Sequence, residues 1–423
     1  MRLGLLLTCV LGRMVAGQQP AAVSNPDHEM VQQLIERVKQ LEAEVRELKA
    51  QRPASAPAPA EAVPAQAAAA QPAPEPARPA PSQTMPDAMP GPSAGFAGMQ
   101  FRGFSDVQYH ASDQRGETHS FSLGQFNLFI TSKLSDRLSV LAEAVVEADE
   151  HNAVGIDLER LLLQYTPSDY FNVSFGRYHT AIGWYNTAYH HSTWLQTATG
   201  RPFLFEFEDR GGILPVHNVG ISVNGRIPSG KLGLHYVAEL GNGRAAPSRP
   251  DAVQQEAVQN VHDDNNGKAV NFGIMARPEW LRAFRAGFSV YRDRLTPEGV
   301  AKVGQTILAA YAVYQSSLFE FLNEAVVIRN ATAETNRVVS HAPGFYTQVS
   351  RRFGAVRPYF RYQYVNVPDR DPLFPGVGLR YGPSLGMRYD VSEFAAFKLQ
   401  YDRTDRRRLS GFNGVTTQLS FTF

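Results

Sequence analysis

Residues 415–423 read VTTQLSFTF, and this last stretch of the chain decides the fold class. One face would carry Val415, Thr417, Leu419, Phe421 and Phe423, and the other would carry Thr416, Gln418, Ser420 and Thr422. Successive side chains of a β-strand point to opposite faces of a sheet, so this alternation predicts a strand with one apolar and one polar face. Its length suits a tilted strand that crosses a membrane in about 9 to 11 residues.

Similar runs recur from Met99 onward. They fall at residues 100–110, 120–133, 137–149, 156–166, 170–180, 217–227, 231–241, 268–276, 284–293, 305–315, 318–329, 343–353, 355–366, 377–389, 393–403 and 412–423. An even number of strands, as here, is typical of bacterial membrane barrels. The runs near 100 and 305 are weak, which leaves barrels of roughly 14 or 18 strands as alternatives within the same class.

The connections between these runs alternate between short and long. The short ones are residues 135–136, 167–169, 228–230, 316–317, 354 and 391–392, and the intervening ones, such as 241–267, are longer and charged. Such alternation is typical of a barrel with tight periplasmic turns and long outer loops. Because backbone groups in lipid must all find partners, the strands are expected to close into one antiparallel barrel.

The composition excludes a helical membrane protein and gives no support to a nucleic-acid-binding one. The chain has a mean hydropathy of -0.27 and no run of about 18 apolar residues, which a membrane-spanning helix would need. Its formal charge is only +1, so net charge indicates no nucleic-acid partner.

The residues before the barrel region predict three segments. Residues 1–17 resemble a signal peptide, with Arg2 before an apolar run that contains Cys9, the only cysteine. Thr8 and the short apolar run do not fit a lipidated cysteine, so the mature chain is expected to carry no thiol. Residues 52–97 hold 12 of the 28 prolines and predict an extended Pro/Ala-rich linker.

Residues 25–51 predict a helix that begins at Asn25-Pro26 and forms a coiled coil. Its apolar positions alternate in steps of three and four, at Val31, Leu34, Val38, Leu41, Val45 and Leu48. Valine at position a and leucine at position d of the heptad favour a coiled coil of two parallel helices. A single amphipathic helix is the alternative.

Residues 98–423, with sixteen predicted strands and a terminal phenylalanine, resemble a Gram-negative outer-membrane porin of the general and phosphate-selective type. The resemblance implies a passive diffusion channel in the outer membrane, with no chemical reaction and no cofactor, and an N-terminal extension in the periplasm. It implies as partners outer-membrane lipid, small hydrophilic solutes or anions, and the barrel-assembly machinery, which would read Leu419, Phe421 and Phe423. It also implies a homotrimer, which the valine/leucine seam does not favour.

In such porins the third outer loop, after the fifth strand, folds into the lumen. Here residues 181–216 follow the fifth predicted strand. Phe203, Phe205 and Phe207 alternate with Leu204, Glu206 and Glu208, so an extended backbone would turn the aromatic rings to the wall and the carboxylates to the water. We expect a constriction formed by Glu206, Glu208, Asp209, Arg210 and Arg201; the alternative is that the acids pair locally with the two arginines.

Assigning the polar face of each strand to the lumen predicts two charged groups there. The acidic residues are Glu143, Glu147, Glu239, Glu320 and Glu324. The basic residues form a wall on four successive strands and comprise Arg352, Arg357, Arg361, Arg380, Arg388 and Lys398. Eight of 41 basic and nine of 40 acidic residues precede Met99, which leaves 33 and 31 in the barrel region and predicts modest ion selectivity.

No catalytic or metal-binding residue is predicted. Residues 190–192 (HHS) lack a third orienting group for nucleophilic catalysis, and residues 262–267 (HDDNNG) lack the final glutamate of an EF-hand loop. A prefix of helix and linker, without a plug domain, argues against an energised transporter. The rival function is a structural anchor, whose coiled coil would tether the outer membrane to the periplasm or cell wall.

Overall fold

The computed structural model describes Gln40 and residues 98–148, 152–189, 193–208, 211–245, 261–263, 265–297, 301–334 and 337–423. The chain divides into two units, Met1–Ala73 and Pro74–Phe423, and only the second is described below. Gln40 is helical. Otherwise the predicted signal peptide, coiled coil and linker lie outside the described residues. No helix within the described ranges is long and apolar enough to span a membrane.

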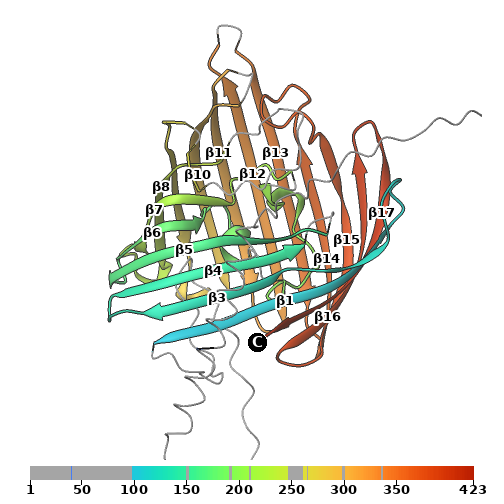
Figure 1. Ribbon diagram of the computed structural model, residues 1–423, viewed down its shortest axis with the longest axis horizontal. Helices are drawn as coiled ribbons and strands as arrows, with labels where there is room; N and C mark the ends of the chain where they lie inside the picture. Colours follow the sequence, from blue (N-terminus) through green and yellow to red (C-terminus); the bar gives the residue numbers. More distant parts are fainter. Residues whose placement is uncertain are drawn as a thin grey trace, which may run out of the picture. The chain divides into compact units, whose positions relative to one another are not determined.

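The second unit is almost entirely β-structure (Figure 1). Its strands are β1 (Met99–Ser112), β2 (Ser120–Leu123), β3 (Phe126–Lys133), β4 (Leu138–Ala148), β5 (Val154–Ser168), β6 (Phe171–His179), β7 (His217–Arg226), β8 (Leu234–Gly241), β9 (Ala269–Ala276), β10 (Phe284–Leu295), β11 (Val303–Gln315), β12 (Phe319–Thr332), β13 (Val339–Arg351), β14 (Val356–Asn366), β15 (Leu379–Asp390), β16 (Ala395–Arg406) and β17 (Leu409–Thr422). The short helical turns are α2 (Tyr185–Ala188), η1 (Phe203–Phe205), η3 (Gly230–Leu232) and η4 (Glu279–Leu281).

These strands form one closed antiparallel sheet. From β3 to β17 each strand pairs with the next one along the chain, and β17 returns to pair with β1 from Phe104↔Thr422 to Ser112↔Gly414. Strands β2 and β3 both pair with β1 at successive positions, so together they occupy one place in the ring. The barrel therefore has sixteen strand positions, which confirms the predicted number and excludes 14 or 18.

The predicted alternation of faces is confirmed along β17. Leu419 is 43% exposed on the outer surface, whereas the neighbouring Gln418 is 2% exposed on the inner surface. On β16, Phe397, Leu399 and Tyr401 are likewise exposed around buried polar side chains. The apolar exterior indicates that the barrel is surrounded by lipid, because so many exposed apolar side chains would be unfavourable in water.

The ends of the barrel differ in the length of their connections. At the end that holds Phe423, tight turns join β3 to β4, β5 to β6, β11 to β12, β13 to β14, and β15 to β16. The opposite end has longer connections, with one difference from the sequence-based expectation. Strands β16 and β17 continue to Arg406 and Leu409, so only Arg407 and Arg408 join them. Their ladder extends beyond the apolar pattern from which the strands were predicted.

Residues 181–216, here called the inner loop, connect β6 to β7, and their described parts, 181–189, 193–208 and 211–216, lie inside the barrel, as green segments within the ring of strands (Figure 1). Apolar side chains of this loop, including Ile182, Leu204 and Ile213, share one buried cluster with side chains of β10 to β14. Residues such as Ile307 and Leu322 therefore face inward. The expectation that only polar faces line the lumen is wrong for this part of the wall, because the loop covers it.

Candidate functional site

The inner loop is anchored at its first helical turn by Glu324 of β12. Backbone N–H groups of Trp184 and Tyr185 donate to the two carboxylate oxygens at 2.5 and 2.9 Å, and the hydroxyl of Tyr346 donates to the same carboxylate at 2.6 Å. The first N–H groups of a helical turn have no partner within the helix, so a carboxylate satisfies them well. Glu324, predicted as a pore-lining acid, lies fully buried beneath the loop.

Aromatic side chains pack around this anchor. The ring of Tyr185 stacks on Phe205 at 5.2 Å and meets the edges of Tyr189 and Tyr346 at 5.4 and 6.1 Å. Burial within the inner loop raises the pKa of the Tyr185 hydroxyl to about 12. The guanidinium of Arg201 lies over Tyr185 and joins the second helical turn to the first. The loop is thus a packed structure with a fixed shape.

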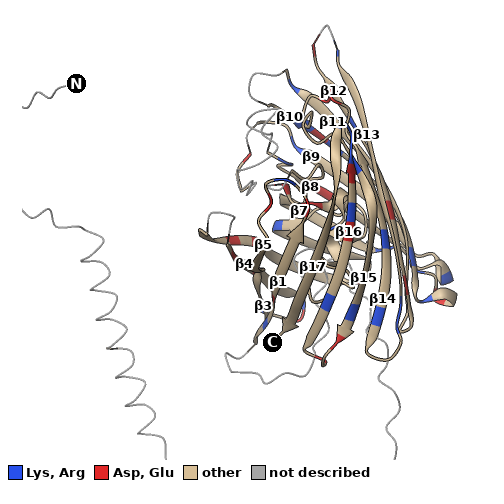
Figure 2. Ribbon diagram, turned by 90° about the vertical axis from the view of Figure 1, so that its right-hand side faces the viewer, with Lys and Arg blue, Asp and Glu red and all other residues tan. Residues whose placement is uncertain are grey.

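The predicted basic wall holds the middle of the inner loop, residues 193–200. Lys398 Nζ donates to the carbonyl oxygens of Thr193 at 2.5 Å and Ala198 at 3.3 Å, and Arg388 donates to those of Trp194 at 2.6 Å and Gln196 at 2.9 Å. Arg361 donates to the carbonyls of Thr199 and Gly200 at 3.3 and 3.2 Å, and Arg357 to the Thr197 hydroxyl at 3.5 Å. Figure 2 shows these basic positions as blue segments on β14, β15 and β16.

The two remaining members of the predicted wall have other contacts. Arg380 on β15 lies over the ring of Phe203 at 5.1 Å. Arg352 lies beyond the end of β13 in the tight turn, where it pairs with Asp390 at 2.9 Å. Asp390 also accepts from Arg388 at 2.7 Å. The wall therefore contains strand residues from β14 to β16, and Arg352 belongs to the turn, because β13 ends one residue earlier.

The stretch with alternating phenylalanines is not extended. Phe203–Phe205 forms a 3-10 turn after Pro202, so its side chains do not follow a period of two. Glu208 is 7% exposed, accepts from Val216 N–H at 3.2 Å and lies 3.6 Å from His217 Nδ1. The expected water-facing position of Glu208 is wrong, whereas Glu206 is half-buried. Asp209 and Arg210 lie outside the described residues.

The other predicted acids face inward and accept hydrogen bonds. Glu143 accepts from Asn127 and Arg160, Glu147 from Gln125, Glu239 from Ala181 N–H and Asn271, and Glu320 from Gln348 and Ser350. Glu239 thus secures the start of the inner loop. Asn271 also donates to the Ala181 carbonyl, although the two residues lie 90 positions apart in the sequence. No local sequence pattern could predict such a contact.

One buried cluster was missed from the sequence. Glu159, His179 and His217 bring a carboxylate and two imidazoles together at the base of the inner loop. The three residues come from three strands, and the gaps between them match no metal-binding motif. Only the pairing of β6 with β7 and an irregularity in β5 place them side by side.

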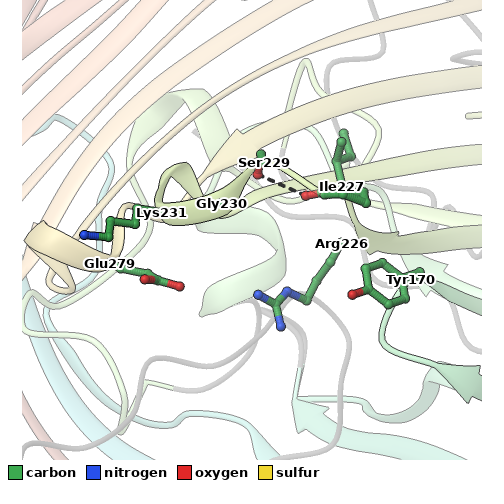
Figure 3. Close-up of a pocket in the computed structure, with 8 residues that line it drawn as sticks. Tyr170, Arg226, Ile227, Ser229, Gly230, Lys231 and Glu279 are labelled. Atoms are coloured by element: carbon green, nitrogen blue, oxygen red, sulfur yellow. Dashed lines mark hydrogen bonds between the residues drawn. The ribbon is translucent and has the colours of Figure 1, made fainter.

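A pocket of about 310 Å³ lies among exposed turns rather than in the lumen. Figure 3 shows Arg226, Lys231 and Glu279 around it, with the Ser229 hydroxyl donating to the Ile227 carbonyl at 3.0 Å. Arg226 is the last residue of β7, and the other side chains belong to the β7–β8 and β9–β10 connections. The pocket is therefore separate from the inner loop.

Comparison with known proteins gives structural matches only. No protein-family model and no curated protein sequence matches the chain. The anion-selective porin from Comamonas acidovorans matches with a TM-score of 0.53 at 11% identity, over 77% of this chain and 99% of that one. The outer membrane channel DcaP of Acinetobacter baumannii gives 0.52 at 13% identity, over 78% and 100%. OmpF of Salmonella typhi gives 0.51 at 9% identity, over 77% and 97%. The chain therefore has the fold of the sixteen-stranded Gram-negative outer-membrane porins.

Proposed function

We propose that the protein is a passive channel of the outer membrane that lets small hydrophilic solutes or ions diffuse through the barrel. The observation that carries this proposal is the inner loop, which is fixed in the lumen by side chains of β12 to β16. A fixed loop narrows a lumen to a defined size, which is how a channel can select solutes. No reaction and no cofactor is part of this proposal.

The charges of the wall support a finer proposal, a modest preference for anions. Arg361 donates to two neutral carbonyl groups, and guanidinium groups stay charged at all physiological pH values. Arg388 also donates to carbonyl groups, but its charge is paired with Asp390. By contrast, the Glu143 carboxylate is paired with Arg160. We propose that half-buried Glu206, Arg357 and Arg380 are the charges that a passing ion meets.

Solute flux tests the channel itself. Liposomes that contain the purified full-length protein should swell in isotonic solutions of small sugars, because a diffusion channel admits the sugars down their own concentration gradient without any other source of energy. Heat-denatured protein in the same liposomes is the control. Vesicles that stay sealed with natively folded protein would contradict the channel and favour the alternative, a structural anchor of the outer membrane.

Charge filtering is tested by reversal potentials in asymmetric KCl. Arg380→Gln should lower the anion preference and Glu206→Gln should raise it. A unit charge about 4 Å from an ion contributes about 1 kcal/mol at the dielectric constant of water, so each permeability ratio should change by up to about fivefold. Arg282→Gln and Glu279→Gln, exposed in the β9–β10 connection, are matched controls. Equal reversal potentials for all four variants would refute filtering by these residues.

We also propose that the chain self-associates in the membrane, with a trimer as the first state to test. The N-terminal extension would lie in the periplasm, and Leu419, Phe421 and Phe423 would be read by the barrel-assembly machinery.

A further inference from the structure

A buried cluster of metal-binding side chains lies where the inner loop leaves and rejoins the barrel wall. It consists of Glu159 on β5, His179 at the end of β6 and His217 at the start of β7. One ligand atom of each residue lies within 4.8 Å of the others, and all three residues are buried. We define these three residues as the loop-base cluster.

The backbone explains why the three side chains converge. His179 and His217 are directly paired across the β6–β7 ladder, and their rings lie 5.6 Å apart. Side chains that are directly opposite on neighbouring antiparallel strands point to the same face of the sheet. Both imidazoles therefore enter the lumen side by side.

Glu159 reaches them through a β-bulge. Glu143 pairs with Arg160 and Ala144 pairs with Leu158, so Glu159 is the extra residue of β5. Leu158 is 42% exposed on the outer surface, whereas Glu159 is 4% exposed on the inner one. Bulges re-aim side chains in this way and are frequent beside functional sites.

The surroundings suit a divalent cation. Glu143 Oε2 lies 3.8 Å from His179 Nε2, and Glu208 Oε2 lies 3.6 Å from His217 Nδ1. Arg160 contacts Glu143, and Arg177 Nε donates to the Glu159 carbonyl at 3.1 Å. Two further charges lie nearby, Arg244 close to Glu208 and Asp157 close to Arg177. With neutral imidazoles, four carboxylates then face three guanidinium groups, so the local charge is negative before an ion binds.

We propose that the loop-base cluster binds one divalent transition-metal ion, of the class for which Zn²⁺ is the probe. Two imidazoles and a carboxylate are zinc ligands, whereas Ca²⁺ and Mg²⁺ prefer oxygen ligands alone. Ligand atoms about 2.0–2.1 Å from a tetrahedral zinc ion lie roughly 3.3 Å from one another, so small side-chain shifts from the observed spacing suffice. Glu208 is positioned to support His217 from the inner loop, as carboxylates often do for metal-bound histidines.

Such an ion would join both ends of the inner loop. His179 lies two residues before the first residue of the loop, and His217 directly follows its last residue. The metal-free alternative is an ion-pair network in which His217 lies between Glu159 and Glu208. The two arrangements differ in a measurable way, because only the first retains a metal ion.

The experiment uses untagged full-length protein in detergent, stripped with EDTA and then dialysed against Zn²⁺. We expect one zinc ion per chain by elemental analysis. We also expect at least a tenfold loss of zinc affinity in His179→Gln/His217→Gln and in Glu159→Gln. His235→Gln is the matched control, since His235 lies on β8 and bonds to the Gly233 carbonyl. A second control replaces His190 and His191, two histidines that are consecutive in the sequence and do not belong to the loop-base cluster.

A spectroscopic measurement on the unchanged protein makes the test independent of variant folding. Co²⁺ bound to two imidazoles and a carboxylate should give visible absorption bands that Zn²⁺ abolishes. Absence of these bands, or equal zinc binding by wild type and by a His179→Gln/His217→Gln variant with native heat-modifiable mobility, would overturn the proposal. Metal content is measured without reference to conductance, so this test and that of the channel can fail separately.

Discussion

At the residue scale, the Glu324 carboxylate holds the first turn of the inner loop through two backbone N–H groups and one hydroxyl. Glu324→Gln keeps the shape but replaces one acceptor oxygen by a donor, which leaves the N–H group of either Trp184 or Tyr185 without an acceptor. The expected cost is about 1–3 kcal/mol, which corresponds to about a 5- to 150-fold increase in local opening. Hydrogen exchange measured by mass spectrometry should therefore rise at residues 184–188 and stay unchanged in β17.

Glu320→Gln is the matched control for Glu324→Gln. Glu320 lies on the same face of β12 but accepts from wall side chains, Gln315, Gln348 and Ser350, and contacts no backbone N–H group of the first helical turn. Gln315 also donates to the Tyr189 hydroxyl, so the comparison is made at residues 184–188. Equal exchange at residues 184–188 in Glu324→Gln and in wild type would show that the carboxylate does not anchor the loop.

At the scale of elements, the strands followed from the sequence because their signal is local. Alternation over about ten residues located all sixteen strand positions. The alternation of short and long connections supported the same number. The bulge at Glu159 and the 3-10 turn at Phe203–Phe205 did not follow, since each breaks the period of two on which the prediction depends.

The contacts of the inner loop could not be predicted for a different reason. The basic residues of β14 to β16 were recognised as a group, but the loop partners of Arg361, Arg388 and Lys398 are carbonyl groups, which every residue possesses. Lys398 and Thr193 lie 205 residues apart. The same limitation applies to the apolar lumen face of β10 to β13, which sequence alternation cannot distinguish from a lipid-facing surface.

At the scale of the whole molecule, Phe423 lies at one end of the β1–β17 seam that closes the barrel. Phe423 exchanges two backbone hydrogen bonds with Gly103, at 2.9 and 3.0 Å, and its ring stacks on Phe126 at 5.5 Å. A Cβ atom on Gly103 would lie only 2.1 Å from that ring. The terminal phenylalanine therefore covers a glycine across the β17–β1 seam, an arrangement known to compensate for a glycine within a sheet.

A double-mutant cycle tests this seam. Gly103→Ala should displace the Phe423 ring and lower the free energy of unfolding in urea by about 1–3 kcal/mol, the usual cost of overpacking. In a Phe423→Ala background the same change should cost much less, because the ring it displaces is gone, and the difference is the coupling energy of the pair. Equal costs in both backgrounds would mean that Gly103 is needed for another reason. Loss of heat-modifiable mobility in the Phe423→Ala single variant would place the effect in assembly of the barrel rather than in the stability of the folded state.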